Sequence, residues 1–272
     1  MIDFDALLTA YISFLLFILG TVIGSFLNVL IYRLPTGMSF QKGRSFCPSC
    51  RHELTWKDLF PLFSWVFLRG KCRYCKEKIS KRYPIVELLT GTLYVLAYLF
   101  LAGGDCFSGL NLSLLGWCTA LSALVVISFV DFEHQIIPDS MWITIFAGGV
   151  FVVLGEVAAG KFKWESLVGR VIGIFAVSFV FFLIGVISKG RAMGGGDVKL
   201  MAAAGFVLGW KAVILSLFLG AFAGVIYSIF SRIIRKTEMR GVVPFGPFLA
   251  IGIAVTMFVG DRIIEYYISF IK

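Results

Sequence analysis

The chain alternates between long apolar runs and shorter segments that are polar and mostly basic. Most runs are near the ~20 residues that an α-helix needs to cross a bilayer, and none alternates with period two, as strands of a membrane barrel would. Eight runs are visible, at about residues 8–31, 83–102, 110–130, 141–159, 167–187, 200–209, 212–230 and 245–259. The pattern predicts an all-α polytopic membrane protein with about eight transmembrane helices. The run 200–209 is too short to span without its flanking residues.

Composition excludes a soluble globular protein. The 272 residues are 59% hydrophobic, against about 45–50% in soluble domains, and the mean hydropathy is +0.92. Asp3 and Asp5 precede the first run and no Lys or Arg does. Because a cleavable signal peptide begins with a basic segment, we expect the first run to be retained as a membrane helix.

The basic residues predict the orientation. If the N-terminus lies outside, the inner segments 32–82, 131–140, 188–199 and 231–244 hold 19 of the 25 Lys and Arg residues. Cytoplasmic loops carry such an excess. We therefore expect a multi-pass protein of the cytoplasmic membrane with its N-terminus outside, and the net charge of +9 indicates topology rather than nucleic-acid binding.

The inner segments also divide the chain. We expect a first transmembrane helix in residues 1–32, a small cytoplasmic module in 33–82 and a transmembrane core in 83–272. The module contains two C-x-x-C pairs, 21 residues apart: Cys47, Cys50, Cys72 and Cys75. Four thiolates suit the tetrahedral site of a structural Zn²⁺, and a module of this size gains stability from a metal. The alternative is two pairs of redox-active or free thiols.

Four polar residues in or beside the apolar runs carry structural expectations. Asn28 should hydrogen-bond a neighbouring helix. Glu87 should lie in the first turn of its helix, where the dipole favours its charge. Arg170 should extend toward the outer membrane surface, and Asp139 should cap the helix that follows it.

Two further aspartates suggest chemistry. Asp131 directly follows an apolar run, and Asp197 follows the triplet Gly194-Gly195-Gly196. Glycines have no side chain, so an extended peptide can lie close against the main chain there. If the bundle brings the two carboxylates together, they do not both ionise easily, so one is protonated while the other is a base. Peptide hydrolysis by an activated water needs that pair of roles.

The order and spacing of several segments resemble the type IV prepilin peptidases, a family of Gly-x-Gly-Asp membrane aspartic proteases. These segments run nearly from end to end: Gly24-Ser25-Phe26-Leu27-Asn28-Val29, Tyr32-Arg33-Leu34-Pro35, both C-x-x-C pairs, Tyr83-Pro84-Ile85-Val86-Glu87, Asp131 through Pro138-Asp139, Gly194-Gly195-Gly196-Asp197-Val198-Lys199, and Pro244-Phe245-Gly246-Pro247-Phe248.

The resemblance implies that Asp131 and Asp197 are the catalytic pair. It implies cleavage of a short basic leader from type IV prepilins or type II secretion pseudopilins, after a Gly on the cytoplasmic side. Members with the cysteine module resemble bifunctional enzymes that then methylate the new N-terminal residue with S-adenosylmethionine. The chain shows no glycine-rich loop of the usual nucleotide-binding kind, so the methyl donor is implied by the resemblance alone.

A basic leader would be repelled by the basic inner loop of Arg232, Arg235 and Lys236 unless acidic groups intervene. We expect Glu133, Asp139 or Glu238 to contact the leader. The residues expected to lie where the substrate approaches are Gly194, Gly195, Gly196, Lys199, Glu133 and Asp139.

Three rival interpretations stay open at this stage. A proton- or ion-coupled transporter could use Asp131 and Asp197 as an ion path, although no interrupted helix repeats between the two halves. A presenilin-like protease would share Gly-x-Gly-Asp but needs a Pro-Ala-Leu segment, which the chain lacks. A noncatalytic scaffold with a zinc module would tolerate substitution of either aspartate.

Overall fold

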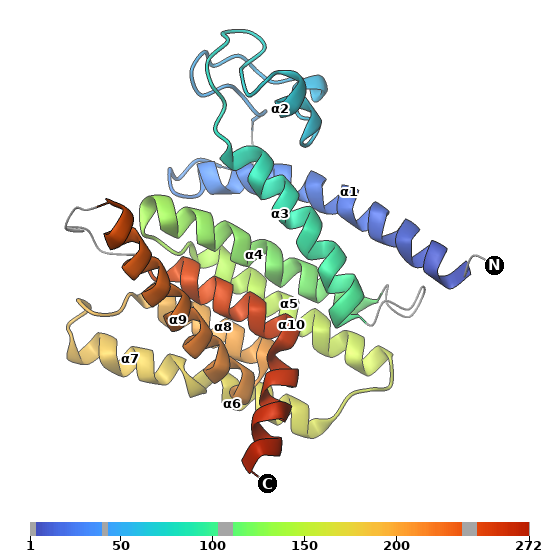
Figure 1. Cartoon of the computed structure of the whole chain (residues 1–272). Helices are drawn as coiled ribbons and strands as arrows, with labels where there is room; N and C mark the ends of the chain where they lie inside the picture. Colours follow the sequence, from blue (N-terminus) through green and yellow to red (C-terminus); the bar gives the residue numbers. More distant parts are fainter. Residues whose placement is uncertain (1–3, 40–42, 103–110, 236–243, 272) are drawn as a thin grey trace. The chain divides into compact units, whose positions relative to one another are not determined.

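The computed structural model describes residues 4–39, 43–102, 111–235 and 244–271 (Figure 1). Glu238, one of the acids expected to contact the leader, lies outside the described residues, and so do the side chains of Arg232 and Arg235. The chain divides into two compact units, Met1–Leu110 and Asn111–Lys272. Each unit is described by itself.

Membrane-length helices dominate both units. Among the described residues, seven segments are long and apolar enough to cross a bilayer: Phe4–Arg33, Arg82–Leu101, Leu112–His134, Asp139–Ala158, Trp164–Ile187, Trp210–Ser231 and Gly246–Phe270. Seven of the eight apolar runs therefore form candidate spans. The remaining run, 200–209, lies in α8 (Gly195–Leu208), a helix of 14 residues that is shorter than the about 20 needed to span.

In the first unit, α1 (Phe4–Arg33) packs against α3 (Arg82–Leu96), which continues into η2 (Ala97–Leu101). A Cβ on Gly20 would lie 2.7 Å from the Cα of Gly91, so small residues set the closeness of the two helices, as is common in membranes. The amide of Asn28 donates to the carbonyl oxygen of Tyr83 at 3.2 Å. The expected bond from Asn28 to a neighbouring helix is confirmed.

The expectation for Glu87 is wrong. The helix begins at Arg82, so Glu87 lies beyond its first turn and is buried. Its carboxylate instead accepts a hydrogen bond of 2.7 Å from the backbone N–H of Leu62. A tertiary partner thus replaces the helix dipole in stabilising this group, and it links α3 to the soluble module.

The soluble module follows α1 and contains η1 (Trp56–Asp58) and α2 (Phe63–Phe67). Its two C-x-x-C pairs form matching turns, closed by isolated bridges between Phe46 and Glu53 and between Lys71 and Lys78. Asp58 joins η1 to the second turn through an ion pair of 2.6 Å with Arg73. The module is therefore organised by the cysteine turns and a few polar contacts rather than by a large apolar core.

The second unit contains α4 (Leu112–His134), α5 (Asp139–Ala158), α6 (Trp164–Ala176), α7 (Ser178–Ile187), α8, α9 (Trp210–Arg235) and α10 (Gly246–Ile271). Glycines bring neighbouring helices together. A Cβ on Gly116 of α4 would lie 2.4 Å from the carbonyl oxygen of Gly148 of α5, and one on Gly252 of α10 would lie 2.2 Å from the carbonyl oxygen of Ser216 of α9. Because lipid is as apolar as the side chains of these helices, close backbone contact is what lets the helices associate.

Arg170 holds the end of the short helix α8. Its guanidinium donates to the carbonyl oxygens of Phe206 and Val207 and pairs with Glu156 at 2.6 Å. The last carbonyls of a helix have no partner within the helix, and a cation is favoured at that end. The expectation that Arg170 extends to the membrane surface is wrong: its side chain is only 9% exposed, because α8 ends inside the unit and needs a donor there.

Candidate active site and metal centre

The end of α4 meets the start of α10 at Asp131, a buried residue. An Asp131 carboxylate oxygen accepts a hydrogen bond of 2.9 Å from the backbone N–H of Gly246, the first residue of α10. The first N–H groups of a helix lack partners within it, so the carboxylate supplies one. A Cβ on Gly246 would lie 2.7 Å from that same oxygen, and glycine is therefore the residue that fits.

Sequence reasoning missed this role of Gly246. The segment Pro244-Phe245-Gly246-Pro247-Phe248 entered only as part of the family resemblance, and nothing connected its glycine to an aspartate 115 residues away. The available signal was the single glycine between two prolines, at a helix start on the same predicted side as Asp131.

Asp197 lies in the first turn of α8. A carboxylate is favoured there by the helix dipole, and the side chain is half-buried. Ile137, six residues after Asp131, lies against Gly196, the residue before Asp197. The contact places the end of α4 near the start of α8, so the charges of the two aspartates, 66 residues apart in the chain, act on each other. Like charges in such proximity do not both ionise easily. The pair can hold one proton between them.

The three glycines before Asp197 differ in their surroundings. A Cβ on Gly194 would lie 3.2 Å from an Asp197 carboxylate oxygen, and a Cβ on Gly196 would lie 2.8 Å from the Cβ of Ile137. A Cβ on Gly195 would meet nothing within 4 Å. The triplet is therefore in close contact with Asp197 at Gly194 and with Ile137 at Gly196, and it is open at its centre.

Lys199 and Asp139 form an ion pair of 2.6 Å at the edge of this region. Asp139 also accepts a hydrogen bond of 2.9 Å from the indole N–H of Trp142. The expected cap is wrong, because Pro138 occupies the N-cap position and the Asp139 side chain accepts from Lys199 and Trp142 instead. The pair is largely exposed, so it contributes little to stability, but it fixes the start of α5 beside the first turn of α8.

Glu133 is exposed near the end of α4, with a carboxylate oxygen 4.0 Å from the ring of His134. Of the acids expected near the leader, Asp139 is thus paired with Lys199, and Glu133 is exposed.

The first unit contains a separate metal-binding arrangement. The sulfur atoms of Cys47, Cys50, Cys72 and Cys75 all lie within 4.8 Å of one another, and those of Cys47 and Cys75 are 3.9 Å apart. A tetrahedral zinc with Zn–S bonds of about 2.3 Å places its sulfurs about 3.8 Å apart. The four cysteines therefore can bind a metal ion of this geometry.

Backbone N–H groups lower the pKa of one of these thiols. Burial alone would raise the pKa of Cys47, but hydrogen bonds from the backbone of Cys50 and Ser49 outweigh burial and lower the pKa to about 7. Metal ligands must be deprotonated to bind. Arg51 and Lys76, each directly after the second cysteine of its pair, adopt the left-handed backbone with φ of 61° and 63°, which closes the two turns around the sulfurs.

Comparison with known proteins assigns the regions that contain both sites to one family of enzymes. Residues 18–101 match the bacterial peptidase A24 N-terminal domain, and residues 118–229 match the type IV leader peptidase family. A prepilin leader peptidase/N-methyltransferase from Aeromonas salmonicida (strain A449) is 33% identical over 94% of this chain and 93% of its own length. This chain belongs to the prepilin leader peptidase/N-methyltransferase family.

Distant bacteria carry similar members of the family. Proteins of the same name from Pseudomonas aeruginosa and Bacillus subtilis (strain 168) are 31% and 33% identical, over 93% and 94% of this chain and 92% and 97% of their own lengths. No solved structure matches the chain. Membership in this family makes the chain an enzyme, so the transporter and scaffold interpretations are set aside.

The two matched regions separate the two sites of this prepilin peptidase family member. The N-terminal match contains all four cysteines, and the leader-peptidase match contains both Asp131 and Asp197. The matches also coincide with the two compact units, since one falls within Met1–Leu110 and the other within Asn111–Lys272.

Proposed function

We propose that this enzyme removes the short basic leader from type IV prepilins or type II secretion pseudopilins by aspartic proteolysis, with Asp131 and Asp197 as its catalytic pair. The observation that carries the proposal is the convergence of two carboxylates at adjacent helix ends, beside an open glycine. One carboxylate is ionised and takes a proton from water. The other is protonated and donates to the carbonyl oxygen of the scissile peptide.

Hydrolysis then proceeds through a tetrahedral intermediate. Collapse breaks the C–N bond. The departing nitrogen takes a proton from the carboxyl group that received one from water, and a hydroxyl of the intermediate returns a proton to the carboxylate that had donated one. The leader leaves with a new carboxylate after its glycine, and the mature chain leaves with a new N-terminal amine. Because protons are shared within the pair, their apparent pKa values belong to the pair rather than to either residue.

The substrate chain must expose its backbone to reach these carboxylates. The scissile segment is proposed to unwind and lie over Gly194, Gly195 and Gly196, where Gly195 leaves open space. The Asp139–Lys199 pair would border this path. The excess of basic residues in the inner segments supports an N-terminus outside and an active site facing the cytoplasm.

The second activity proposed is N-methylation of the amine that cleavage exposes. When bound, S-adenosylmethionine supplies a methyl group that replaces a proton of the amine, and it leaves as S-adenosylhomocysteine. A structural Zn²⁺ on Cys47, Cys50, Cys72 and Cys75 would hold the module. Both proposals are supported by the family's bifunctional name and by the sulfur geometry.

The deciding experiment measures the intact mass of a purified prepilin after incubation with the enzyme in lipid, with and without S-adenosylmethionine. Asp131→Asn and Asp197→Asn should each slow cleavage by about a hundredfold or more, because loss of general acid–base catalysis costs about 10²–10⁴ in rate. A donor-dependent gain of one methyl group in the cleaved product would establish the second activity.

The matched control is Asp261→Asn, since Asp261 is an exposed aspartate of α10 far along the chain from both catalytic candidates. It should cleave at the wild-type rate. Cleavage that persists at that rate in either Asp131→Asn or Asp197→Asn would remove that residue from the proposed pair.

Glu133 is proposed to attract the basic leader. Glu133→Gln should raise KM about two- to fivefold for a prepilin with a basic leader, the effect of losing one exposed charge pair, with kcat unchanged. The comparison substrate has its leader lysines and arginines replaced by glutamine. If Glu133→Gln changes KM equally for both substrates, or for neither, Glu133 does not read the charge of the leader.

A further inference from the structure

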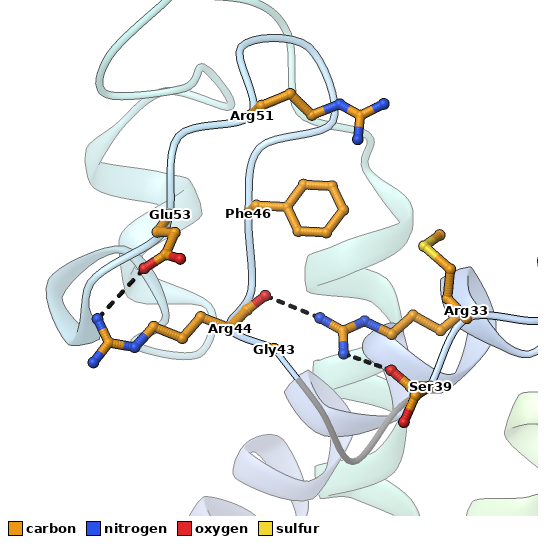
Figure 2. Close-up of a pocket in the computed structure, with 8 residues that line it drawn as sticks. Arg33, Ser39, Gly43, Arg44, Phe46, Arg51 and Glu53 are labelled. Carbon is orange, nitrogen blue, oxygen red and sulfur yellow. Dashed lines mark hydrogen bonds and ion pairs between the residues drawn. The ribbon is translucent and has the colours of Figure 1, made fainter.

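A pocket of about 520 Å³ opens in the soluble module of the first unit. Figure 2 shows that its lining comes from the end of α1, the loop that follows and the first cysteine turn. The lining includes Arg33, Met38, Arg44, Phe46, Arg51 and Glu53. Small-molecule sites fall in the range of about 300–1,000 Å³, so the pocket has the size of a ligand rather than of a macromolecular surface.

Arg33 builds the wall of this pocket. It is 5% exposed, and its guanidinium donates to the backbone carbonyl oxygens of Ser39 and Arg44, both at 2.9 Å (Figure 2). These bonds tie the loop after α1 to the first cysteine turn. The side chain of Arg33 is therefore used in forming the pocket.

Arg44 and Glu53 stand at the rim with opposite charges. Their side chains are 80% and 66% exposed and 3.4 Å apart, so water screens their attraction and little is lost when they separate. Both can turn toward a ligand. A guanidinium holds a carboxylate with two parallel bonds, and a carboxylate accepts from an ammonium or from hydroxyls.

An aromatic ring and a planar cation line the same pocket. The guanidinium of Arg51 lies 5.7 Å from the centre of the Phe46 ring (Figure 2), and the ring of Tyr32 meets Phe46 edge-on at 6.3 Å. Flat faces of this kind stack on nucleobases. The first cysteine turn presents both residues, since Phe46 precedes Cys47 and Arg51 follows Cys50.

We propose that this pocket is the binding site for the methyl donor S-adenosylmethionine. The adenine would stack at Phe46 and Arg51, the amino-acid carboxylate would bind Arg44, and Glu53 would accept from the ammonium or the ribose hydroxyls. A carboxylate beside an arginine at the rim suits a ligand that carries both an ammonium and a carboxylate. A phosphate would bind the arginine but has no donor for Glu53. The inference rests on the methyltransferase part of the proposed function, and it assigns that activity to residues of the first unit.

The test measures binding directly. The full chain in lipid nanodiscs is titrated with S-adenosylmethionine and with S-adenosylhomocysteine by calorimetry, for wild type and for Phe46→Leu, Arg44→Gln and Glu53→Gln. Phe46→Leu and Arg44→Gln should each raise Kd about tenfold, as loss of a stacked base or a charge-assisted bond would. Glu53→Gln should have a smaller effect in the same direction.

Two controls lie in the same module outside this pocket. Phe67→Leu matches Phe46→Leu at a side chain that is 81% exposed, and Lys57→Gln matches the charge removed from Arg44. Both should bind with the wild-type Kd. Every variant should retain its metal and cleave a prepilin at the wild-type rate, which shows that the module and the peptidase core are folded.

Several outcomes would overturn the proposal. If wild type binds and methylates while the three pocket variants keep the wild-type Kd, the donor binds elsewhere and the proposed function stands. If wild type cleaves prepilin but neither binds the donor nor methylates, the pocket assignment and the methyltransferase activity fall together, while the peptidase stands. If inorganic phosphate or short-chain phosphatidylglycerol binds instead and only that binding is lost in Arg44→Gln, the pocket is an anion site.

Discussion

The two units hold their chemical groups by different physical means. In the second unit, Asp131 and Asp197 are placed by helix ends, and the helices are brought together by glycines such as Gly116 and Gly252. In the first unit, four cysteines gather at two short turns in a module with little helix of its own. One site depends on the packing of long helices, whereas the other depends on the ligands themselves.

The difference predicts how strongly the fold around each site responds to the loss of a functional side chain. A helix bundle has many contacts, so removing one side chain from the proposed catalytic pair should leave the fold in place. A module of about fifty residues has too small a core to fold well alone, and a metal bound by its four cysteines would contribute directly to folding. We therefore expect catalysis and stability to be separable in the second unit, and metal binding and stability to be inseparable in the cysteine module.

Removing the metal should have the largest effect. Structural zinc contributes about 10 kcal/mol or more to the folding of small modules, so chelation or Cys72→Ser should unfold the cysteine turns. Hydrogen exchange of backbone amides should rise across residues 44–80, while protection in residues 112–134 of α4 is unchanged.

Cys118→Ser is the matched control for that measurement. Cys118 is a buried cysteine of α4 outside the cluster, so this variant should keep the wild-type metal content. If the module stays protected after the metal is lost, its fold does not depend on the ligands, and the contrast between the units disappears.

In the second unit, the corresponding test is Arg170→Ala, which removes a tertiary contact between helices rather than a metal ligand. Arg170→Ala leaves Glu156 and the last carbonyls of α8 without their donor, and breaking a buried pair costs about 3–5 kcal/mol. The unfolding midpoint of the helical core should fall, measured in lipid, while the metal content of the module stays at the wild-type value.

Arg191→Ala provides the comparison, because Arg191 is exposed between α7 and α8. It should leave the midpoint within experimental scatter. An equal loss of stability in both variants would mean that the effect follows from lost charge, and not from the end of α8.

The smallest effect is expected for Gly195→Ala. This variant distinguishes a role of Gly195 in helix packing from a role in contacting the substrate. Because a Cβ there meets nothing within 4 Å and alanine favours a helix by about 1 kcal/mol over glycine, Gly195→Ala should not destabilise the core. It should lower kcat/KM for prepilin about tenfold if the substrate backbone lies over this glycine.

Gly185→Ala is its control, since the nearest atom to a Cβ at that position of α7 is 3.7 Å away, an ordinary contact. Wild-type cleavage by Gly195→Ala would show that the substrate does not approach over the centre of the triplet.

The local sequence determined the features that depend on hydropathy and spacing. Long apolar runs must satisfy their backbone groups within the segment, and in lipid they do so as helices, so the helical fold was predictable. Two C-x-x-C pairs were enough to indicate a metal site, because the spacing within each pair already brings its two thiols together. Asp131 and Asp197 stood out because a carboxylate beside an apolar membrane segment is energetically unfavourable, and such residues usually have a function.

The partners of those groups were decided by the tertiary structure. Nothing near Asp131 in the chain indicates that Gly246 donates to it, and nothing near Asp139 indicates that it pairs with Lys199 rather than capping its own helix. Arg170 was expected at the membrane surface, yet it lies inside because α8 ends within the unit. Hydropathy describes how each segment meets lipid, but a polar group inside a bundle binds whichever complementary group the packing of distant helices brings within reach.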